Sequence, residues 1–128
     1  MLSLPLPLHV YLCLEPADMR RSFDGLAALV REHLGGDPLS GDLYVFRSRR
    51  GDRVKLLYWT GDGLALWYKR LEEGTFPFPA DATGLTDAAA VGKHGLSIRA
   101  ADLAMLLDGV DLASVKRSKR YRRPTATA

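Results

Sequence analysis

Apolar residues along the first part of the chain follow two different patterns. Residues 8–14 (LHVYLCL) are continuously apolar, which predicts a buried strand. From residue 17 to residue 34 the apolar positions recur mostly every three or four residues, which predicts a helix with one apolar face. Gly35 and Gly36 end this helix, because glycine readily adopts the left-handed backbone that follows a helix.

Residues 43–71 contain three apolar runs separated by two tight-turn signals. Gly-Asp at 51–52 and Gly-Asp-Gly at 61–63 are typical of the short loops that join antiparallel strands. The strands are expected at 43–48, 53–60 and 64–70. Large side chains fall on both faces of the second and third strands. This favours either a central strand covered on both sides or an exposed aromatic face used for binding.

The next part of the chain predicts an edge segment and one more helix. Thr75–Pro79 is expected to be an extended edge segment, since proline lacks the amide that a central strand needs. Residues 80–94 are expected to be the least structured internal stretch. Residues 96–98 favour either a short strand or the lead-in to a helix with Ser97 as its N-cap. Gly109 ends that helix. Its apolar positions are Leu103, Met105, Leu106 and Leu107.

These elements together predict a single α+β domain over residues 1–112. An antiparallel β-meander sheet of four or five strands is expected to carry the long helix on one face. The short C-terminal helix is expected near an edge. Residues 113–128 are expected to form a basic, disordered tail that is dispensable for folding, because they have no apolar periodicity.

Cysteine content and the start of the chain indicate the compartment. The 128 residues include one cysteine, so no disulfide can form within the chain. Cys13 lies in an apolar run and is expected in the core. A reducing cytoplasm fits this composition. The apolar start lacks the basic segment of a signal peptide and is too short to span a membrane, so no membrane association is expected.

Charge is distributed unevenly along the chain. Six of the 18 basic residues lie in residues 114–128, which contain no acid, so the rest of the chain has a small excess of acidic side chains. A mildly acidic domain with a basic tail is typical of a protein that contacts nucleic acid, and a solvated tail without a ligand is the alternative. The six residues are Lys116, Arg117, Lys119, Arg120, Arg122 and Arg123.

A second basic cluster surrounds the first hairpin turn. A basic two-stranded ribbon can enter the major groove of DNA. The candidate DNA-binding residues are Arg47, Arg49, Arg50, Arg53 and Lys55, with Lys69 and Arg70 expected at the opposite end of the three strands. Aromatic side chains nearby are candidates for stacking on unpaired bases, for docking on a protein, or for packing under the helices. They are Tyr58, Trp59, Trp67 and Tyr68.

Many short motifs stand in an order typical of one family. They include residues 18–26 (DMRRSFDGL), 37–41 (DPLSG), 49–59 (RRGDRVKLLYW), 61–64 (GDGL), 69–72 (KRLE) and 103–111 (LAMLLDGVD). Over about residues 8–112 the chain resembles the TnpB accessory proteins of bacterial insertion sequences of the sixty-six type. These are distinct from the RNA-guided nucleases that share the name TnpB. The resemblance implies a role in transposition beside a separately encoded DDE-type transposase, with no firmly assigned chemistry. The tail after Asp111 and residues 80–94 depart from the family pattern and inherit no role from it.

Catalysis and metal binding are not expected from this sequence. A DDE active site needs three carboxylates that converge on two metal ions. Four aspartates of this chain lie beside glycine or proline, where turn formation favours them: Asp37, Asp42, Asp52 and Asp62. The three histidines are scattered, which excludes a zinc-binding pattern, and no cofactor is expected.

The sequence therefore predicts a non-catalytic accessory protein of DNA transposition that binds DNA through the 47–55 hairpin and the basic tail. The alternative is a protein-interaction module that docks on the transposase of the element. The DNA site, the oligomeric state and the step of transposition that the protein serves stay open at this point.

Overall fold

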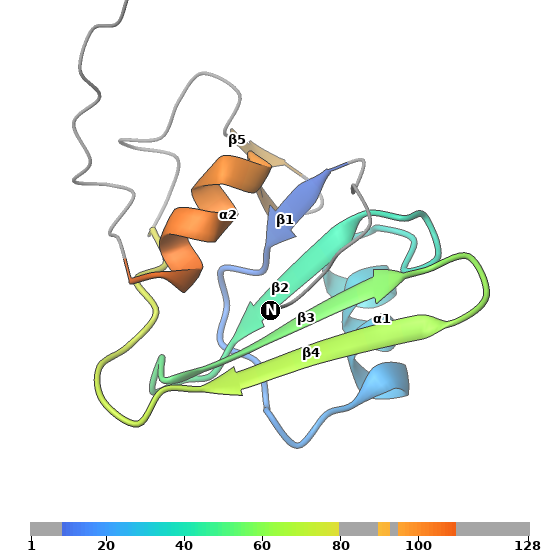
Figure 1. The fold of residues 1–128 in the computed structure, drawn as a ribbon. Coiled ribbons are helices and arrows are strands. Elements are labelled where there is room, and N and C mark those ends of the chain that lie inside the picture. Colours follow the sequence, from blue (N-terminus) through green and yellow to red (C-terminus); the bar gives the residue numbers. More distant parts are fainter. Residues whose placement is uncertain (1–8, 80–89, 93–94, 110–128) are drawn as a thin grey trace, which may run out of the picture.

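The computed structural model describes residues 9–79, 90–92 and 95–109. One mixed sheet has six strands in the order β4-β3-β2-β1-β6-β5. The strands are β1 Val10–Leu12, β2 Leu43–Arg47, β3 Arg53–Trp59, β4 Leu64–Arg70, β5 Ala90–Gly92 and β6 Gly95–Ile98. The helices, α1 Phe23–His33 and α2 Ala100–Leu107, lie on opposite faces of the sheet (Figure 1). The protein is a single α+β domain. Within the described ranges, no helix has the length and apolarity needed to cross a membrane.

The expectation of a wholly antiparallel sheet of four or five strands is wrong. β2, β3 and β4 pair antiparallel in succession, and β1 pairs antiparallel with β6. β1 and β2, however, run parallel, with Tyr11 opposite Tyr44. The chain between them contains α1, and a parallel pair needs a long crossover of this kind. Hydrophobic periodicity indicates the individual elements, but it does not fix which strands become neighbours.

Both faces of the sheet are buried against helices. On the α1 side the core consists of Cys13, Leu26, Ala27, Val30, Leu34, Tyr44, Phe46 and Leu57. On the other side, α2 contributes Leu103 and Leu106 to a core that also contains Phe76 and Leu56. β3 therefore supplies Leu57 to one core and Leu56 to the other. Burial of both faces of this central strand explains its large apolar side chains in successive positions.

Helix α1 begins at Phe23 rather than at Ala17, and the buried Lys55 explains the difference. The ammonium of Lys55 donates hydrogen bonds to the backbone carbonyl oxygens of Met19 at 2.8 Å and of Arg21 at 2.6 Å. A helix beginning at Ala17 would use these carbonyls as acceptors for its own amides. Lys55 therefore holds the segment before Phe23 in a non-helical conformation.

The helix ends combine one correct and one wrong expectation. Gly35 (φ 60°) follows α1 in the expected left-handed conformation, and Gly109 (φ 91°), expected to end α2, also has a positive φ. Ser97 is not an N-cap, because it lies in β6 opposite Tyr11. Arg99 is the N-cap of α2, and its backbone N–H donates to the Asp102 carboxylate at 3.2 Å.

The segment after β4 enters the core instead of adding a strand at the edge. Residues 75–79, expected as an edge segment, contain no assigned strand, and Phe76 is fully buried. The Phe76 N–H donates to the carbonyl oxygen of Gly51 at 2.7 Å. This bond ties the segment to the turn between β2 and β3.

Candidate nucleic-acid interface

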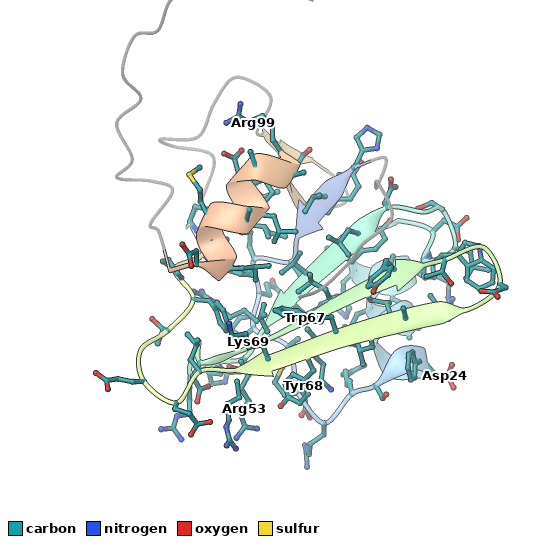
Figure 2. The ribbon with its side chains drawn as sticks, in the orientation of Figure 1. Asp24, Arg53, Trp67, Tyr68, Lys69 and Arg99 are labelled. Atoms are coloured by element: carbon teal, nitrogen blue, oxygen red, sulfur yellow. The ribbon has the colours of Figure 1, made fainter. Side chains whose placement is uncertain are left out.

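The register of β3 and β4 brings basic side chains of both strands to one end of the sheet. Arg53 lies opposite Arg70, and Val54 lies opposite Lys69. The expectation that Lys69 and Arg70 lie far from the β2–β3 turn is wrong, because in an antiparallel hairpin the end of one strand lies beside the start of the other. We call the five basic residues gathered here the basic end of the sheet. They are Arg49, Arg50, Arg53, Lys69 and Arg70, of which Figure 2 labels Arg53 and Lys69.

The turn between β2 and β3 is fixed by hydrogen bonds on two sides. Ser48 Oγ accepts the backbone N–H of Arg53 at 3.1 Å. Gly51 has a φ of 81°, and its carbonyl oxygen accepts the N–H of Phe76. A Cβ at this position would also lie 3.3 Å from the Cβ of Thr75. The arginines at the tip of the turn therefore project from a well-anchored backbone, which favours a preorganised binding surface.

Most side chains of the basic end make no ion pair within the part of the chain that the structure describes. Within the described residues, the ion pairs involve Arg70 but not Arg49, Arg50, Arg53 or Lys69. Arg49 and Arg50 are exposed, and Arg53 is half-buried. Arg70 Nη2 lies 3.0 Å from Glu72 Oε2, and both side chains are exposed. An exposed ion pair of this kind is weak, so Arg70 is able to exchange Glu72 for another anion.

Two predicted DNA-binding residues are engaged inside the protein. Arg47 Nη1 donates to the carbonyl oxygen of Phe76 at 2.8 Å, and its guanidinium carbon lies 4.5 Å from the centre of the Phe78 ring. Burial lowers the pKa of Arg47. Lys55 is 5% exposed and is bonded to the two loop carbonyls described above. Both side chains stabilise the fold in this structure, so we omit them from the DNA contacts proposed below.

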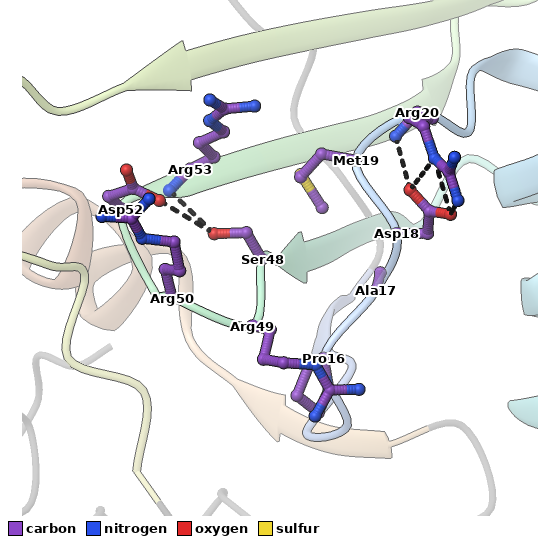
Figure 3. Close-up of a pocket in the computed structure, with 10 residues that line it drawn as sticks. All are labelled: Pro16, Ala17, Asp18, Met19, Arg20, Ser48, Arg49, Arg50, Asp52 and Arg53. Carbon is purple, nitrogen blue, oxygen red and sulfur yellow. Dashed lines mark hydrogen bonds and ion pairs between the residues drawn. The ribbon is translucent and has the colours of Figure 1, made fainter.

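A surface pocket of about 540 Å³ lies between the β2–β3 turn and residues 16–20 (Figure 3). Its lining residues are Pro16, Ala17, Asp18, Met19, Arg20, Ser48, Arg49, Arg50, Asp52 and Arg53. Arg20 Nη2 lies 2.8 Å from Asp18 Oδ2, and the side-chain hydrogen bond from Arg20 lowers the pKa of Asp18 to about 2. These two charges offset each other, and Asp52 offsets one of the three turn arginines, so the pocket keeps a net positive charge. Arginine is well suited to binding phosphate in such a place.

Sequence reasoning did not single out Arg20 as a pocket residue. The apolar periodicity placed it on a helix, outside the apolar face. The structure instead has Arg20 in a turn, where the backbone N–H of Arg20 donates to Asp18 Oδ1 at 2.9 Å. The apolar periodicity missed this turn because Lys55, far away in the sequence, decides where the helix begins.

The four candidate aromatic side chains do not share one face of the sheet. Tyr58 is 9% exposed and Trp67 packs against the core on the α2 side. Trp59 and Tyr68 point to the α1 side of the sheet. They lie near opposite ends of the β3–β4 pair, since Trp59 is opposite Leu64 and Tyr68 is opposite Lys55. Tyr68 is 48% exposed. These aromatics therefore form no single docking surface, and Tyr68 is the most exposed of the four.

The turn aspartates accept local hydrogen bonds, as their sequence context predicted. The donors are the Leu39 N–H to Asp37 at 2.9 Å, Ser40 Oγ to Asp42 at 3.0 Å, Ser48 Oγ to Asp52 at 3.2 Å and Thr60 Oγ1 to Asp62 at 3.1 Å. Among the residues that the structure describes, no three His, Cys, Asp or Glu side chains gather in a way that could hold a metal ion. These carboxylates stabilise turns in this structure.

Comparison with known proteins identifies the family. Residues 8–117 match the family described as IS66 Orf2 like protein. The chain belongs to this family. The family is one of accessory proteins of insertion sequences, which is consistent with an accessory role in transposition. The match includes Lys116 and Arg117 of the basic tail and ends before its other four basic residues. All six lie outside the described residues.

Two similar proteins come from Sinorhizobium fredii strain NBRC 101917 / NGR234. The one named "Uncharacterized protein y4jC" is 38% identical over 121 residues, which cover 94% of each chain. The one named "Uncharacterized protein y4hO" is 36% identical over 103 residues, which cover 80% of this chain and 81% of the relative. No solved structure matches the chain.

Proposed function

We propose that this IS66 Orf2-like protein is a non-catalytic accessory factor of transposition that binds DNA through the basic end of the sheet. It would act in the cytoplasm, where bacterial DNA is located. The observation that carries the proposal is the register of Arg53 opposite Arg70, beside a rigid turn with Arg49 and Arg50 exposed at its tip. Several guanidinium groups held on one well-anchored surface can bind the regularly spaced phosphates of a DNA backbone.

The basic tail adds further phosphate contacts in this proposal. Its basic residues run from Lys116 to Arg123 without an intervening acid. Contacts of this kind give affinity without reading sequence, because phosphates are the same at every step of DNA. Deletion of residues 114–128 is expected to weaken DNA binding and to leave the melting temperature nearly unchanged. A large fall in melting temperature would show that the tail packs on the domain.

A salt titration of duplex binding tests the role of the turn. The Arg49→Gln/Arg50→Gln variant is compared with the wild type on a duplex that carries the end of the element. For each phosphate that is no longer neutralised, the slope of log affinity against log salt falls by about 0.9, so we expect a slope smaller by up to about 1.8 together with weaker binding. Arg31→Gln is the matched control, since Arg31 is an exposed arginine on α1, outside the basic end. Unchanged affinity and slope in a variant with a native circular dichroism spectrum would contradict the proposal.

Docking on the transposase is the second candidate function. Two large apolar side chains outside the basic end are unusually exposed, Phe23 by 43% and Leu39 by 50%. A contiguous patch of exposed apolar side chains marks a surface that binds proteins, so the test asks whether these two side chains belong to one. Purified transposase and this protein are expected to co-elute without DNA if docking is correct, and Phe23→Ser/Leu39→Ser is expected to abolish the complex. The Arg49→Gln/Arg50→Gln variant would then still co-elute with the transposase. Co-elution that occurs only in the presence of DNA would contradict direct docking.

The non-catalytic character has its own test. The purified protein is incubated with element-end DNA and Mg²⁺ or Mn²⁺, and the products are compared with those of Asp52→Ala and Asp62→Ala. We expect no cleavage by any of the three proteins, because both carboxylates accept hydrogen bonds within their turns. Cleavage that either substitution abolishes would overturn the proposal.

A further inference from the structure

Tyr68 occupies an unusual position for a large aromatic side chain. It is 48% exposed. Side chains two residues apart on a strand share a face, so Tyr68 lies on the same face as Arg70. Arg53 shares this face, because it lies opposite Arg70. Figure 2 shows Tyr68 and Arg53 on one side of β3 and β4, with Trp67 and Lys69 on the other side. An exposed ring therefore adjoins two arginines on one face.

The Tyr68 ring is held in place from the inside. The Lys55 ammonium lies 4.6 Å from the ring centre, in the position of a cation–π contact. That ammonium is itself fixed by its hydrogen bonds to the carbonyl oxygens of Met19 and Arg21. The ring is thus supported by a buried, hydrogen-bonded cation, while nearly half of its surface is accessible.

The spacing of the ring and the arginines suits one nucleotide. Two residues along a strand cover about 6.6–6.8 Å, which a nucleotide can span between its base and its phosphate. Aromatic rings that stack on bases, next to basic side chains that hold the backbone, are the common elements of single-strand binding sites. In a duplex the bases are stacked on one another and offer no free face to such a ring.

We propose that Tyr68 stacks on an unpaired base while Arg53 and Arg70 hold the adjacent phosphate, so that the basic end prefers single-stranded to double-stranded DNA. This inference rests on the proposed DNA binding and specifies its ligand. The other aromatics of the β3–β4 pair are not suited to this role. Tyr58 is buried, Trp67 packs against the core, and Trp59 lies near the far end of the pair, opposite Leu64.

Two fluorescent probes of equal length separate stacking from charge. One is an oligothymidylate, and the other is an abasic strand with the same phosphate backbone and no bases. Binding is measured by anisotropy at several salt concentrations for the wild type, Tyr68→Phe and Tyr68→Leu. Trp59→Leu is the control, because it removes a partly exposed aromatic side chain from the same face at the other end of β3.

The wild type and Tyr68→Phe are expected to bind oligothymidylate roughly 10-fold more tightly than the abasic strand. Tyr68→Leu is expected to bind both probes with the affinity that the wild type has for the abasic strand, and with an unchanged salt slope. Trp59→Leu is expected to behave as the wild type. Equal affinity of the wild type for the two probes, or an equal loss for both probes in Tyr68→Leu, would overturn the inference. If the inference is overturned but Arg49→Gln/Arg50→Gln still weakens duplex binding, the proposed DNA binding stands. If the wild type binds none of the DNA probes, both the proposed function and the inference are wrong.

Discussion

Arg53 and Arg70 lie directly opposite each other on β3 and β4. Like charges in directly opposite positions destabilise an antiparallel pair. Glu72 offsets part of this repulsion, since its carboxylate lies 3.0 Å from Arg70. A phosphate placed between the two guanidinium groups would offset more of it. The Arg53–Arg70 pair therefore lowers the stability of the free protein and makes binding of an anion more favourable.

Replacing Arg70 with threonine separates these two effects. Arg70→Thr removes the repulsion and introduces a residue with high strand propensity, at the cost of a weak exposed ion pair. We expect the free energy of unfolding to be unchanged or higher by about 0.5 kcal/mol, and DNA affinity to fall. Thermal unfolding and salt-dependent binding measure the two quantities. A clear loss of stability with unchanged DNA affinity would show that Arg70 has a structural role alone.

Lys55 is expected to be essential for the loop before α1. Lys55→Met keeps the length of the side chain but removes two charge-assisted hydrogen bonds to backbone carbonyls. We expect a loss of about 3 kcal/mol, which corresponds to a melting temperature lower by about 10 °C. Trypsin is also expected to cleave faster after Arg20 and Arg21, because the loop is no longer tied to the sheet.

Lys69→Met is the matched control for Lys55→Met. Lys69 is an exposed lysine of β4, opposite Val54, and makes no ion pair within the described residues. Its replacement is expected to leave the melting temperature and the trypsin cleavage rate close to the wild-type values. Equal stability of the two variants would contradict the role given to Lys55.

Gly36 is expected to tolerate no side chain beside Tyr44. A Cβ on Gly36 would lie 2.5 Å from the Tyr44 hydroxyl oxygen, and Tyr44 is 1% exposed. We expect Gly36→Ala to lower the free energy of unfolding by about 1–3 kcal/mol, as overpacking does in protein cores. Gly63→Ala is the control, because a Cβ there meets nothing within 4 Å. If the clash is the cause, Tyr44→Phe is expected to recover part of the loss, and a double-mutant cycle measures the recovery.

Cys13 is expected to react slowly with alkylating reagents in the native protein. The side chain is 8% exposed, and burial raises the pKa of its thiol above the ordinary value of 9.0. A raised pKa means that the native state holds the thiol proton more firmly than the unfolded state does. The resulting stabilisation is fully present below about pH 9 and is lost as the pH rises through the native pKa. Iodoacetamide at pH 8 is expected to label unfolded protein much faster than native protein, and equal rates would contradict burial of Cys13.

Local sequence signals predicted the separate elements because each depends on neighbouring residues. Glycine-rich turns at 51–52 and 61–63 separate β2, β3 and β4, and apolar spacing indicates most of α1. The turn roles of Asp52 and Asp62 also follow from their neighbours, since side chains four and two residues away supply the hydrogen bonds. Such interactions are nearly the same in any fold that contains the segment.

The pairing of distant segments was decided by the tertiary structure. The parallel alignment of β1 with β2 follows from the path of the crossover, and the meeting of Arg53 with Arg70 follows from the register of a hairpin. Arg47 and Lys55 have the sequence context of surface cations, yet carbonyl groups far away in the sequence bind both of them inside the protein. The sequence thus determined which segments form helices and strands, through propensity and periodicity. Only packing between distant segments determined which basic side chains stabilise the fold and which stay exposed at the basic end, because burial and pairing depend on neighbours that no local pattern encodes.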